Sequence, residues 1–186
     1  MLGDKESDYV ALDCEMVEGP HKKSLVAEVA VVDWNGTPLY HTFVKPSVPV
    51  VNYRTEITGL TPDSLKFGAR FDTAQRKVLD LIQNKIVVGH ALDNDLRALG
   101  ISHAPVRNTA KHNFFKTMNP YGALQPQKLV RLHETYIGST IQEGSHSALE
   151  DARASMKVYR TLHDQWHVPV QHEGPLYQKI VSTPRI

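Results

Sequence analysis

Acidic residues stand at several points of the sequence where a carboxylate could bind a metal ion. Asp13 and Glu15 lie two apart in an apolar, β-rich stretch, so a strand would present both on one face. A solvent-facing strand commonly shows the same alternation, so this pair alone does not establish a site. Carboxylates are hard oxygen ligands that suit Mg²⁺ or Mn²⁺. Metal-assisted hydrolysis is therefore the first chemistry to consider.

A predicted helix over residues 92–99 offers two further carboxylates, Asp93 and Asp95. The leucines of this segment define its apolar face. At 100° per residue, Asp95 lies roughly 60° from the centre of that face and Asp93 roughly 100° from it on the other side. A metal ligand belongs at the edge of the buried face, where it is held in place and still reaches a cleft. This favours Asp95.

The last predicted helix, residues 147–166, offers Glu150 and Asp151. Ser147 and Glu150 have the spacing of a capping box, which would account for Glu150 without any chemistry. Asp151 falls roughly 70° from the centre of the apolar stripe, again at its edge. His146 precedes the predicted cap, and the residue at that position commonly lies beside the one at the position of Asp151. The sequence therefore pairs an imidazole with a carboxylate.

Together these choices give five candidate catalytic residues. In chain order they are Asp13, Glu15, Asp95, His146 and Asp151. Two divalent ions about 4 Å apart can clamp the attacking and leaving oxygens of a phosphodiester. A histidine near its ordinary pKa can take the proton of an attacking water. The set predicts metal-dependent phosphodiester hydrolysis.

The elements that must position these residues follow from hydrophobic periodicity and turn signals. Strands are predicted over residues 9–17, 25–33, 39–44 and 86–88, with a fifth beginning at Val106. Helices are predicted to open at Thr61-Pro62 and to span residues 71–83, 92–99, 127–136 and 147–166. Asn35-Gly36 marks a hairpin, and residues 111–126 read as a loop. This order predicts an α/β fold: a mixed five-stranded sheet with an N-terminal antiparallel hairpin and helices on both faces.

Composition limits the class of protein. The chain has 186 residues, the size of one domain. Its single cysteine, Cys14, cannot form an internal disulfide, which favours a reducing, intracellular compartment. No apolar run is long enough to span a bilayer, and residues 1–8 lack the apolar stretch of a signal peptide. We expect an intracellular protein with no membrane partner.

Charge is distributed unevenly along the chain. The formal net charge is only +1, but residues 96–133 contain no Asp or Glu and carry six cationic side chains, which leaves −5 for the remainder. The six are Arg97, Arg107, Lys111, Lys116, Lys128 and Arg131. A basic segment beside an acidic remainder suits a phosphate track next to a carboxylate metal site. A solvated loop and helix would show the same charges.

Four stretches carry a resemblance to a known family. They are Ala11–Met16 (ALDCEM), Tyr53–Thr61 (YRTEITGLT), Val87–Asp95 (VVGHALDND) and Gly144–Arg153 (GSHSALEDAR). From residue 9 to about 160 the chain resembles the DEDDh 3′→5′ exonucleases, which have the ribonuclease H-like fold. Within that family it is similar to the RNA exonucleases that include yeast ribosomal-RNA trimming enzymes and the interferon-induced vertebrate exonuclease.

The resemblance implies a role for each matching residue. Two Mg²⁺ or Mn²⁺ ions would be bound by Asp13, Glu15, Asp95 and Asp151, with His146 as the general base. The terminal nucleotide would be lined by Met16, Tyr53, Arg54 and Leu60. The implied activity is a monomeric 3′→5′ exoribonuclease that releases nucleoside 5′-monophosphates from single-stranded RNA ends. The implied location is the nucleus or nucleolus, or else the cytoplasm. The exonuclease domain would span residues 1–167, followed by a C-terminal tail over 168–186.

Two positions depart from the family pattern. Ala91 stands where Asn or Asp is usual after Gly-His, and Asn108-Thr109 stands where Asp-Thr is usual. Neither belongs to the five candidates, so the departures bear on the support of the site and on substrate preference. Two alternatives stay open at this stage. One is a DNA exonuclease of the same fold, and the other is an inactive domain that binds nucleic acid or a protein.

Overall fold

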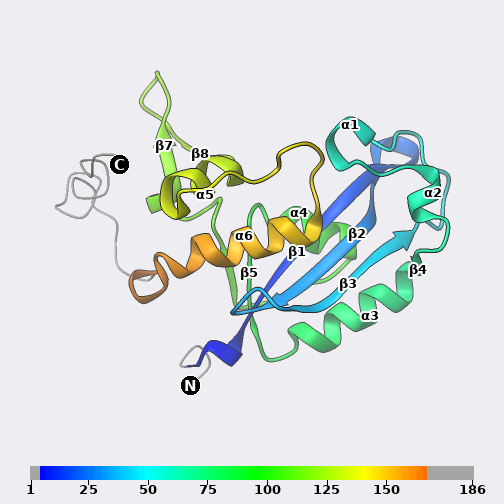
Figure 1. Ribbon diagram of the computed structural model, residues 1–186, viewed down its shortest axis with the longest axis horizontal. Helices are drawn as coiled ribbons and strands as arrows, with labels where there is room; N and C mark the ends of the chain where they lie inside the picture. Colours follow the sequence, from blue (N-terminus) through cyan, green and yellow to red (C-terminus); the bar gives the residue numbers. More distant parts are fainter. Residues whose placement is uncertain (1–4, 167–186) are drawn as a thin grey trace.

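A computed structural model describes residues 5–166 as one mixed α/β domain (Figure 1). Six strands form the central sheet in the order β4-β3-β2-β1-β5-β6. Their bounds are β1 Tyr9–Glu18, β2 Ser24–Asp33, β3 Pro38–Lys45, β4 Ala69–Arg70, β5 Ile86–Gly89 and β6 Val106–Asn108. Strands β1, β2 and β3 pair antiparallel, and the other three pairings are parallel. The predicted fold class is confirmed, including the N-terminal antiparallel hairpin. The sheet has six strands where five were predicted, because the two residues of β4 are too few to show alternation.

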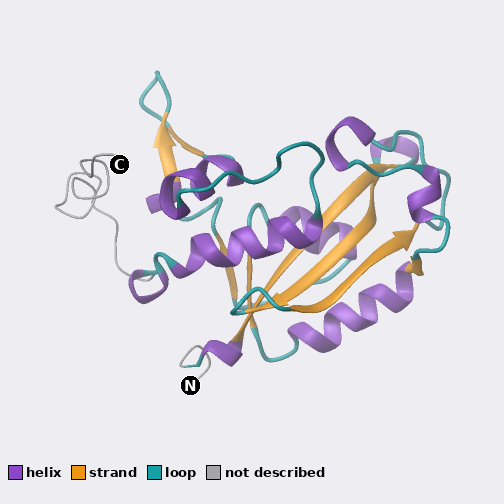
Figure 2. Cartoon of the chain, in the orientation of Figure 1, coloured by secondary structure: helices purple, strands orange, loops and turns teal. Residues whose placement is uncertain are grey.

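Helices cover both faces of the sheet, as predicted (Figure 2). The α-helices are α1 Thr55–Thr58, α2 Pro62–Leu65, α3 Phe71–Ile82, α4 Asp93–Leu99, α5 Leu129–Ile137 and α6 Ala148–Arg160. Short 3₁₀ turns occupy Glu6–Asp8, Pro20–Lys22, Asn113–Phe115 and His163–Gln165. Helices α3 and α4 pack on one face and α6 on the other, while α5 packs against α6. Among these helices none has both the length and the apolarity that a membrane crossing requires.

Strand β1 is buried on both of its faces. Val10, Leu12 and Cys14 join the core under α3 and α4, while Tyr9 and Ala11 join the core under α6. The predicted alternation is therefore correct. The face that carries Asp13 and Glu15 does not meet solvent as an ordinary surface face would, because both side chains are buried. A strand buried on both sides can hold charged groups only where those groups have partners.

The start and end of α6 differ from the prediction. Ser147 occupies the N-cap position, but its side chain makes no capping hydrogen bond. Its hydroxyl lies 3.4 Å from Oε1 of Glu28, and Oε2 of Glu150 accepts from the backbone N–H of Gln142 at 3.1 Å. The predicted capping box is therefore wrong, because both side chains have partners outside the helix. The α-helix ends at Arg160 instead of Trp166.

Residues 116–126, predicted as part of a loop, form a second, two-stranded sheet. Strands β7 (Lys116–Met118) and β8 (Leu124–Pro126) pair antiparallel in a hairpin that projects from the body of the domain (Figure 1). Three residues per strand are too few for an alternation pattern, which is why the sequence did not indicate them. Residues 1–4 and the predicted tail over 168–186 lie outside the described residues. The domain boundary at residue 167 stays a prediction.

Candidate active site

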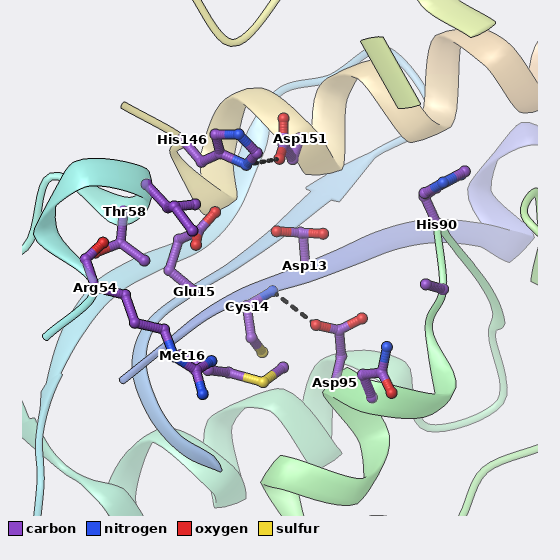
Figure 3. Close-up of a pocket in the computed structure, with 13 residues that line it drawn as sticks. Asp13, Cys14, Glu15, Met16, Arg54, Thr58, His90, Asp95, His146 and Asp151 are labelled. Atoms are coloured by element: carbon purple, nitrogen blue, oxygen red, sulfur yellow. Dashed lines mark hydrogen bonds and ion pairs between the residues drawn. The ribbon is translucent and has the colours of Figure 1, made fainter. Parts of the chain in front are cut away.

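The five candidate residues line one cleft (Figure 3). They come from three separate parts of the fold: strand β1, helix α4, and the start of helix α6 with the residue before it. Met16 and Arg54 line the same cleft, as predicted for contacts to a terminal nucleotide. Leu60 does not line it. That side chain is 3% exposed and packs in a separate apolar cluster.

Strand β1 places Asp13 and Glu15 on the cleft side of the sheet. Asp13 pairs in register with Ala30 of β2, and Glu15 pairs with Glu28. The register shifts directly after Glu15, before Met16. A bulge of this kind bends a strand and turns its side chains to new directions. Met16 can therefore line the cleft as well as pack against the core beneath it.

Asp95 lies where the pairing between strands β1 and β5 has ended. Strand β5 pairs with β1 only over Tyr9–Ala11, so the backbone of β1 beyond that point needs other partners. The Oδ1 atom of Asp95 accepts a hydrogen bond from the backbone N–H of Cys14 at 3.1 Å (Figure 3). Asp93, the alternative carboxylate, is half exposed and forms an ion pair with Lys111 at 2.7 Å. The side chain at the edge of the apolar face is the one that lines the cleft.

Asp151 is buried on the first turn of α6, whereas its neighbour Glu150 is exposed. Its Oδ2 atom accepts a hydrogen bond from Nε2 of Gln142 at 2.7 Å and lies 3.7 Å from Nδ1 of His146. Its Oδ1 atom is also buried, yet has no hydrogen-bond partner within residues 5–166. A buried carboxylate oxygen without a donor is costly unless something else binds it. This atom is therefore available to a cation.

The position of His146 depends on contacts that the sequence did not indicate. Its backbone N–H donates to the carbonyl oxygen of Ile57 in α1 at 2.7 Å. Gly59, which ends α1 with a φ of +69°, allows this approach, because a Cβ atom there would lie 2.7 Å from Cβ of Ser145. The Ile-Thr-Gly stretch thus holds the segment before α6 against α1. Thr58 from the same stretch lines the cleft beside His146 (Figure 3).

Burial makes the negative charge of this cleft expensive. Removal from water raises the pKa values of Glu15 and Asp95 to about 8 and that of Asp151 to about 6. Burial and the repulsion of Asp95 and Asp151 raise the pKa of Asp13 well above its ordinary value. Ligand atoms of Glu15, His146 and Asp151 lie within 4.8 Å of one another. Divalent cations would neutralise the charge that these carboxylates otherwise avoid by keeping their protons.

Glu28 is a buried carboxylate beside the site that the sequence did not single out. It lies opposite Glu15 in the sheet, and its Oε1 atom is 2.6 Å from Nε2 of His41 on β3. Its charge contributes to the raised pKa values of Asp13, Glu15 and Asp151. A charged residue inside the apolar run of residues 25–32 was the signal that could have identified it.

His90 forms the opposite wall of the cleft (Figure 3). Its Nδ1 atom lies 2.9 Å from Oγ1 of Thr109, and the backbone of Gln127 lies beside the ring. Burial lowers the pKa of His90 to about 4, so the ring is neutral at physiological pH. This wall therefore adds hydrogen-bonding groups to the cleft but no positive charge.

The two departures from the family pattern contact each other. The backbone N–H of Ala91 donates to Oδ1 of Asn108 at 3.0 Å, and that of Ala110 donates to the same atom at 3.2 Å. The amide nitrogen of Asn108 donates to Oδ2 of Asp93 at 3.2 Å. Ala91 adopts a φ of +56°, in the left-handed region that disfavours alanine. The hydrogen bonds of Asn108 thus stabilise the loop between β5 and α4, whereas the positive φ of Ala91 is a source of backbone strain in it.

Arg54 is held at the rim of the cleft by its backbone and by an acidic partner. It has a φ of +53° at the N-cap of α1, and its backbone N–H donates to Oδ1 of Asn52 at 2.8 Å. Its guanidinium forms an ion pair with Oε2 of Glu18 at 3.2 Å. Tyr53, the preceding residue, packs against the apolar cluster of Leu60 instead of lining the cleft. Of this pair, the arginine is the residue placed to contact a ligand.

Comparison with known proteins identifies a family that this chain matches. A model of the exonuclease family matches residues 10–159. RNA exonuclease 4 of Homo sapiens is 36% identical over 171 residues, which is 90% of this chain and 40% of that protein. RNA exonuclease 4 of Saccharomyces cerevisiae is 39% identical over 156 residues, which is 82% of this chain and 53% of that protein. The chain thus spans about half the length of the curated relatives that it matches.

Among solved structures, the chain is similar to the catalytic region of Pan2. The pseudoubiquitin hydrolase–RNA exonuclease module of Saccharomyces cerevisiae Pan2, in complex with A7 RNA, gives a TM-score of 0.74 at 24% identity. The match covers 94% of this chain and 30% of that one. The catalytic unit of Neurospora crassa Pan2 gives 0.71 at 25% identity, over 86% of this chain and 27% of that one. By its sequence match over most of its length, this chain belongs to the exonuclease family.

Proposed function

We propose that this chain is a metal-dependent 3′→5′ exoribonuclease that releases nucleoside 5′-monophosphates from single-stranded RNA. One observation carries the proposal: four buried carboxylates from β1, α4 and α6 meet beside His146 in a single cleft. Burying four like charges is unfavourable unless cations compensate them. Two relatives named RNA exonuclease 4 support RNA as the substrate.

The residues of the cleft fit a pair of divalent cations. Asp13, Glu15, Asp95 and Asp151 would hold the ions, and the buried Oδ1 atom of Asp151, which has no hydrogen-bond partner among residues 5–166, is one oxygen that could do so. When bound, Mg²⁺ or Mn²⁺ stabilises the negative charge on the attacking and leaving oxygens of a phosphodiester. An all-oxygen ligand set suits these ions and does not favour softer metals.

His146 would serve as the general base. Its imidazole is about one-third exposed and lies at the mouth of the cleft next to Asp151. A neutral ring at this position can accept a proton from a water molecule and pass it to solvent. The hydrogen bond from its backbone to Ile57 fixes the segment from which the ring extends.

Met16 and Arg54 would contact the terminal nucleotide. The thioether offers a soft apolar surface for a base, and the guanidinium can donate to a phosphate or a sugar. Leu60 would act only indirectly: its carbonyl oxygen accepts from Oγ1 of Thr55 at 2.6 Å, which joins it to α1 at the rim of the cleft. None of the five catalytic candidates distinguishes the 2′-hydroxyl of RNA, so DNA stays the alternative substrate.

The test is a cleavage assay with single-stranded RNA and DNA oligomers of one sequence, labelled at either end. In Mg²⁺ or Mn²⁺ we expect 5′-labelled RNA to shorten stepwise and 3′-labelled RNA to release a mononucleotide from the start. EDTA and the Asp13→Asn variant should both abolish cleavage. Faster cleavage of DNA would select the alternative substrate. RNA binding without cleavage in any metal would identify an inactive binding domain instead.

A further inference from the structure

The β7–β8 hairpin exposes apolar side chains to solvent. Tyr121 at its turn is 94% exposed, and Met118 at the end of β7 is 63% exposed. The preceding aromatic residues of the same segment behave differently: Phe115 is fully buried, and Phe114 packs against Tyr136. Phe114 and Phe115 therefore pack within the domain, whereas Tyr121 lies in solvent. One exposed ring is ordinary on a protein surface, so the order of the turn, its place relative to the cleft and the nearby charges decide whether this ring binds a ligand.

The turn of the hairpin is ordered by its own hydrogen bonds. The Oδ1 atom of Asn119 accepts from the backbone N–H groups of Tyr121 at 3.0 Å and Ala123 at 2.9 Å. The backbone N–H of Asn119 donates to the carbonyl oxygen of Ala123 at 2.9 Å, and Gly122 supplies a φ of +79°. An Asx turn of this kind fixes the local backbone. Tyr121 is therefore presented from a defined turn, which lowers the entropy that binding has to remove.

The base of the hairpin is joined to the wall of the cleft. The backbone of Gln127, the residue after β8, lies beside the ring of His90, and His90 lines the cleft. The side-chain amide of Gln127 also donates to the carbonyl oxygen of Phe115 at 3.1 Å, at the start of β7. Six residues at about 3.3 Å each place the turn within roughly 20 Å of Gln127. A strand leaving the cleft past His90 would run along this hairpin.

The charge of the surrounding segment selects the kind of molecule that binds. Residues 96–133 carry six cationic side chains, of which Lys111 and Arg131 form ion pairs with Asp93 and Glu134. Lys116 begins β7 and Lys128 follows β8 by two residues, so these two cations flank the base of the hairpin. Cations below an exposed aromatic ring suit an occupant with phosphates and flat bases, which is a single-stranded nucleic acid. An apolar protein partner would not require the cations.

We propose that the β7–β8 hairpin is a second binding site for the RNA strand whose 3′ end lies in the cleft. Tyr121 stacks on an upstream base, and Lys116 and Lys128 bind the phosphates between that base and the cleft. A stacked strand advances about 3.4 Å per nucleotide, so roughly 20 Å corresponds to about six nucleotides. The inference rests on the proposed exoribonuclease function. It adds that long substrates are preferred over short ones.

The test compares kcat/KM for a single-stranded RNA 12-mer with that for a trimer, which is too short to reach the turn. In the wild-type protein the 12-mer should be favoured. Tyr121→Ala should lower the ratio of the two values about tenfold, within the usual contribution of one stacked base. Tyr121→Phe retains an aromatic face and should keep the wild-type ratio. Phe67→Ala is the matched control, because Phe67 is 89% exposed but lies between α2 and β4, at the opposite edge of the sheet.

The outcomes separate the two proposals. If wild-type protein degrades both oligomers and Tyr121→Ala keeps the wild-type ratio, the hairpin site is wrong and the exoribonuclease function stands. If wild-type protein degrades neither oligomer, the function fails, and the hairpin site fails with it. An equal loss of ratio in Phe67→Ala would also overturn the hairpin site, since any exposed ring would then have the same effect. Replacing Lys116 and Lys128 by Gln should reduce the salt dependence of 12-mer binding.

Discussion

The catalytic cleft and the β7–β8 hairpin depart from the usual distribution of residues in opposite directions. The cleft buries four carboxylates, and the hairpin leaves Tyr121 and Met118 in water. Either arrangement costs free energy in the isolated protein, since charges belong in solvent and apolar surfaces belong in the core. In the proposed function, cations compensate the buried charge of the cleft, and an RNA strand covers the exposed ring of the hairpin. The size of the cost differs, because burying a charge is far more expensive than exposing one aromatic ring.

The largest expected effect is on catalysis in the cleft. Asp13→Ala and Asp151→Ala each remove a proposed metal ligand and should lower the rate of RNA cleavage by several orders of magnitude. Both variants should remain folded, because each relieves repulsion among the remaining carboxylates. Single-turnover cleavage assays and circular dichroism measure the two properties separately. Undiminished cleavage by both variants would contradict the two-metal site.

His146→Ala should lower kcat by about 10²–10⁴-fold, the usual contribution of a positioned base. It should retain affinity for Mn²⁺, because in the proposed mechanism the ring is not a metal ligand. The close grouping of Glu15, His146 and Asp151 makes this measurement decisive. A large loss of Mn²⁺ affinity in titration calorimetry would show that His146 binds metal. Glu150→Ala is the control: its carboxylate is exposed and hydrogen-bonded outside the cleft, so kcat should change little.

The sequence predicted the catalytic geometry better than it predicted the surroundings. Helix-face angles selected Asp95 over Asp93 and Asp151 over Glu150, and these are the side chains that line the cleft. That method works because the edge of an apolar face is a local property of one helix. Their roles as ligands stay predictions until the variants are assayed.

The failures came from contacts between distant parts of the chain. Ser147 does not cap α6, because its hydroxyl is turned toward Glu28 on β2. Leu60 was assigned to the nucleotide pocket from resemblance, yet it packs in the core. The hairpin at residues 116–126 depends on a short turn at Asn119 and Gly122, and strands of three residues are too short to show alternation in the sequence. No local pattern reports the long-range partners of a side chain.

The metal-free protein should lose stability as the pH rises. The carboxyl groups of Glu15, Asp95 and Asp151 have folded-state pKa values of about 8, 8 and 6, above their ordinary values near 4. These groups therefore do not change the free energy of unfolding below about pH 4, and they lower it as the pH rises toward about 8. The loss should be at least on the order of a few kcal/mol, because one unit of pKa shift corresponds to about 1.4 kcal/mol and three groups contribute. Urea unfolding in EDTA from pH 4.5 to 8.5 measures it.

Adding Mn²⁺ should reverse this trend, because bound cations favour the ionised carboxylates. The stabilisation should be greater at pH 8 than at pH 5.5, where protons compete for the same oxygens. Asp13→Asn, which removes one ionisable group with a raised pKa from the cleft, should flatten the pH dependence in EDTA. A metal-free protein whose stability rises over this range would contradict the raised pKa values.

Backbone strain at the rim of the cleft should have a smaller effect. Ala91 has a φ of +56°, a conformation that asparagine tolerates better than alanine. Ala91→Asn should therefore raise the free energy of unfolding by about 0.5–1 kcal/mol. Ala123→Asn in the hairpin turn is the control, since Ala123 has no positive φ to relieve. Equal changes in both variants would show that the backbone of Ala91 is not the cause.

The smallest effect on stability should come from the hairpin. Tyr121 is almost fully exposed, so Tyr121→Ala removes little buried surface and should change the free energy of unfolding by no more than about 0.5 kcal/mol. Asp13→Asn, in contrast, should stabilise the metal-free protein measurably, because it removes a group whose ionisation is opposed by burial and by the neighbouring carboxylates. The same urea titration in EDTA at pH 8 compares both variants with wild type. A large destabilisation by Tyr121→Ala would mean that the ring packs within the domain, and the hairpin would then have no aromatic face to offer an RNA base.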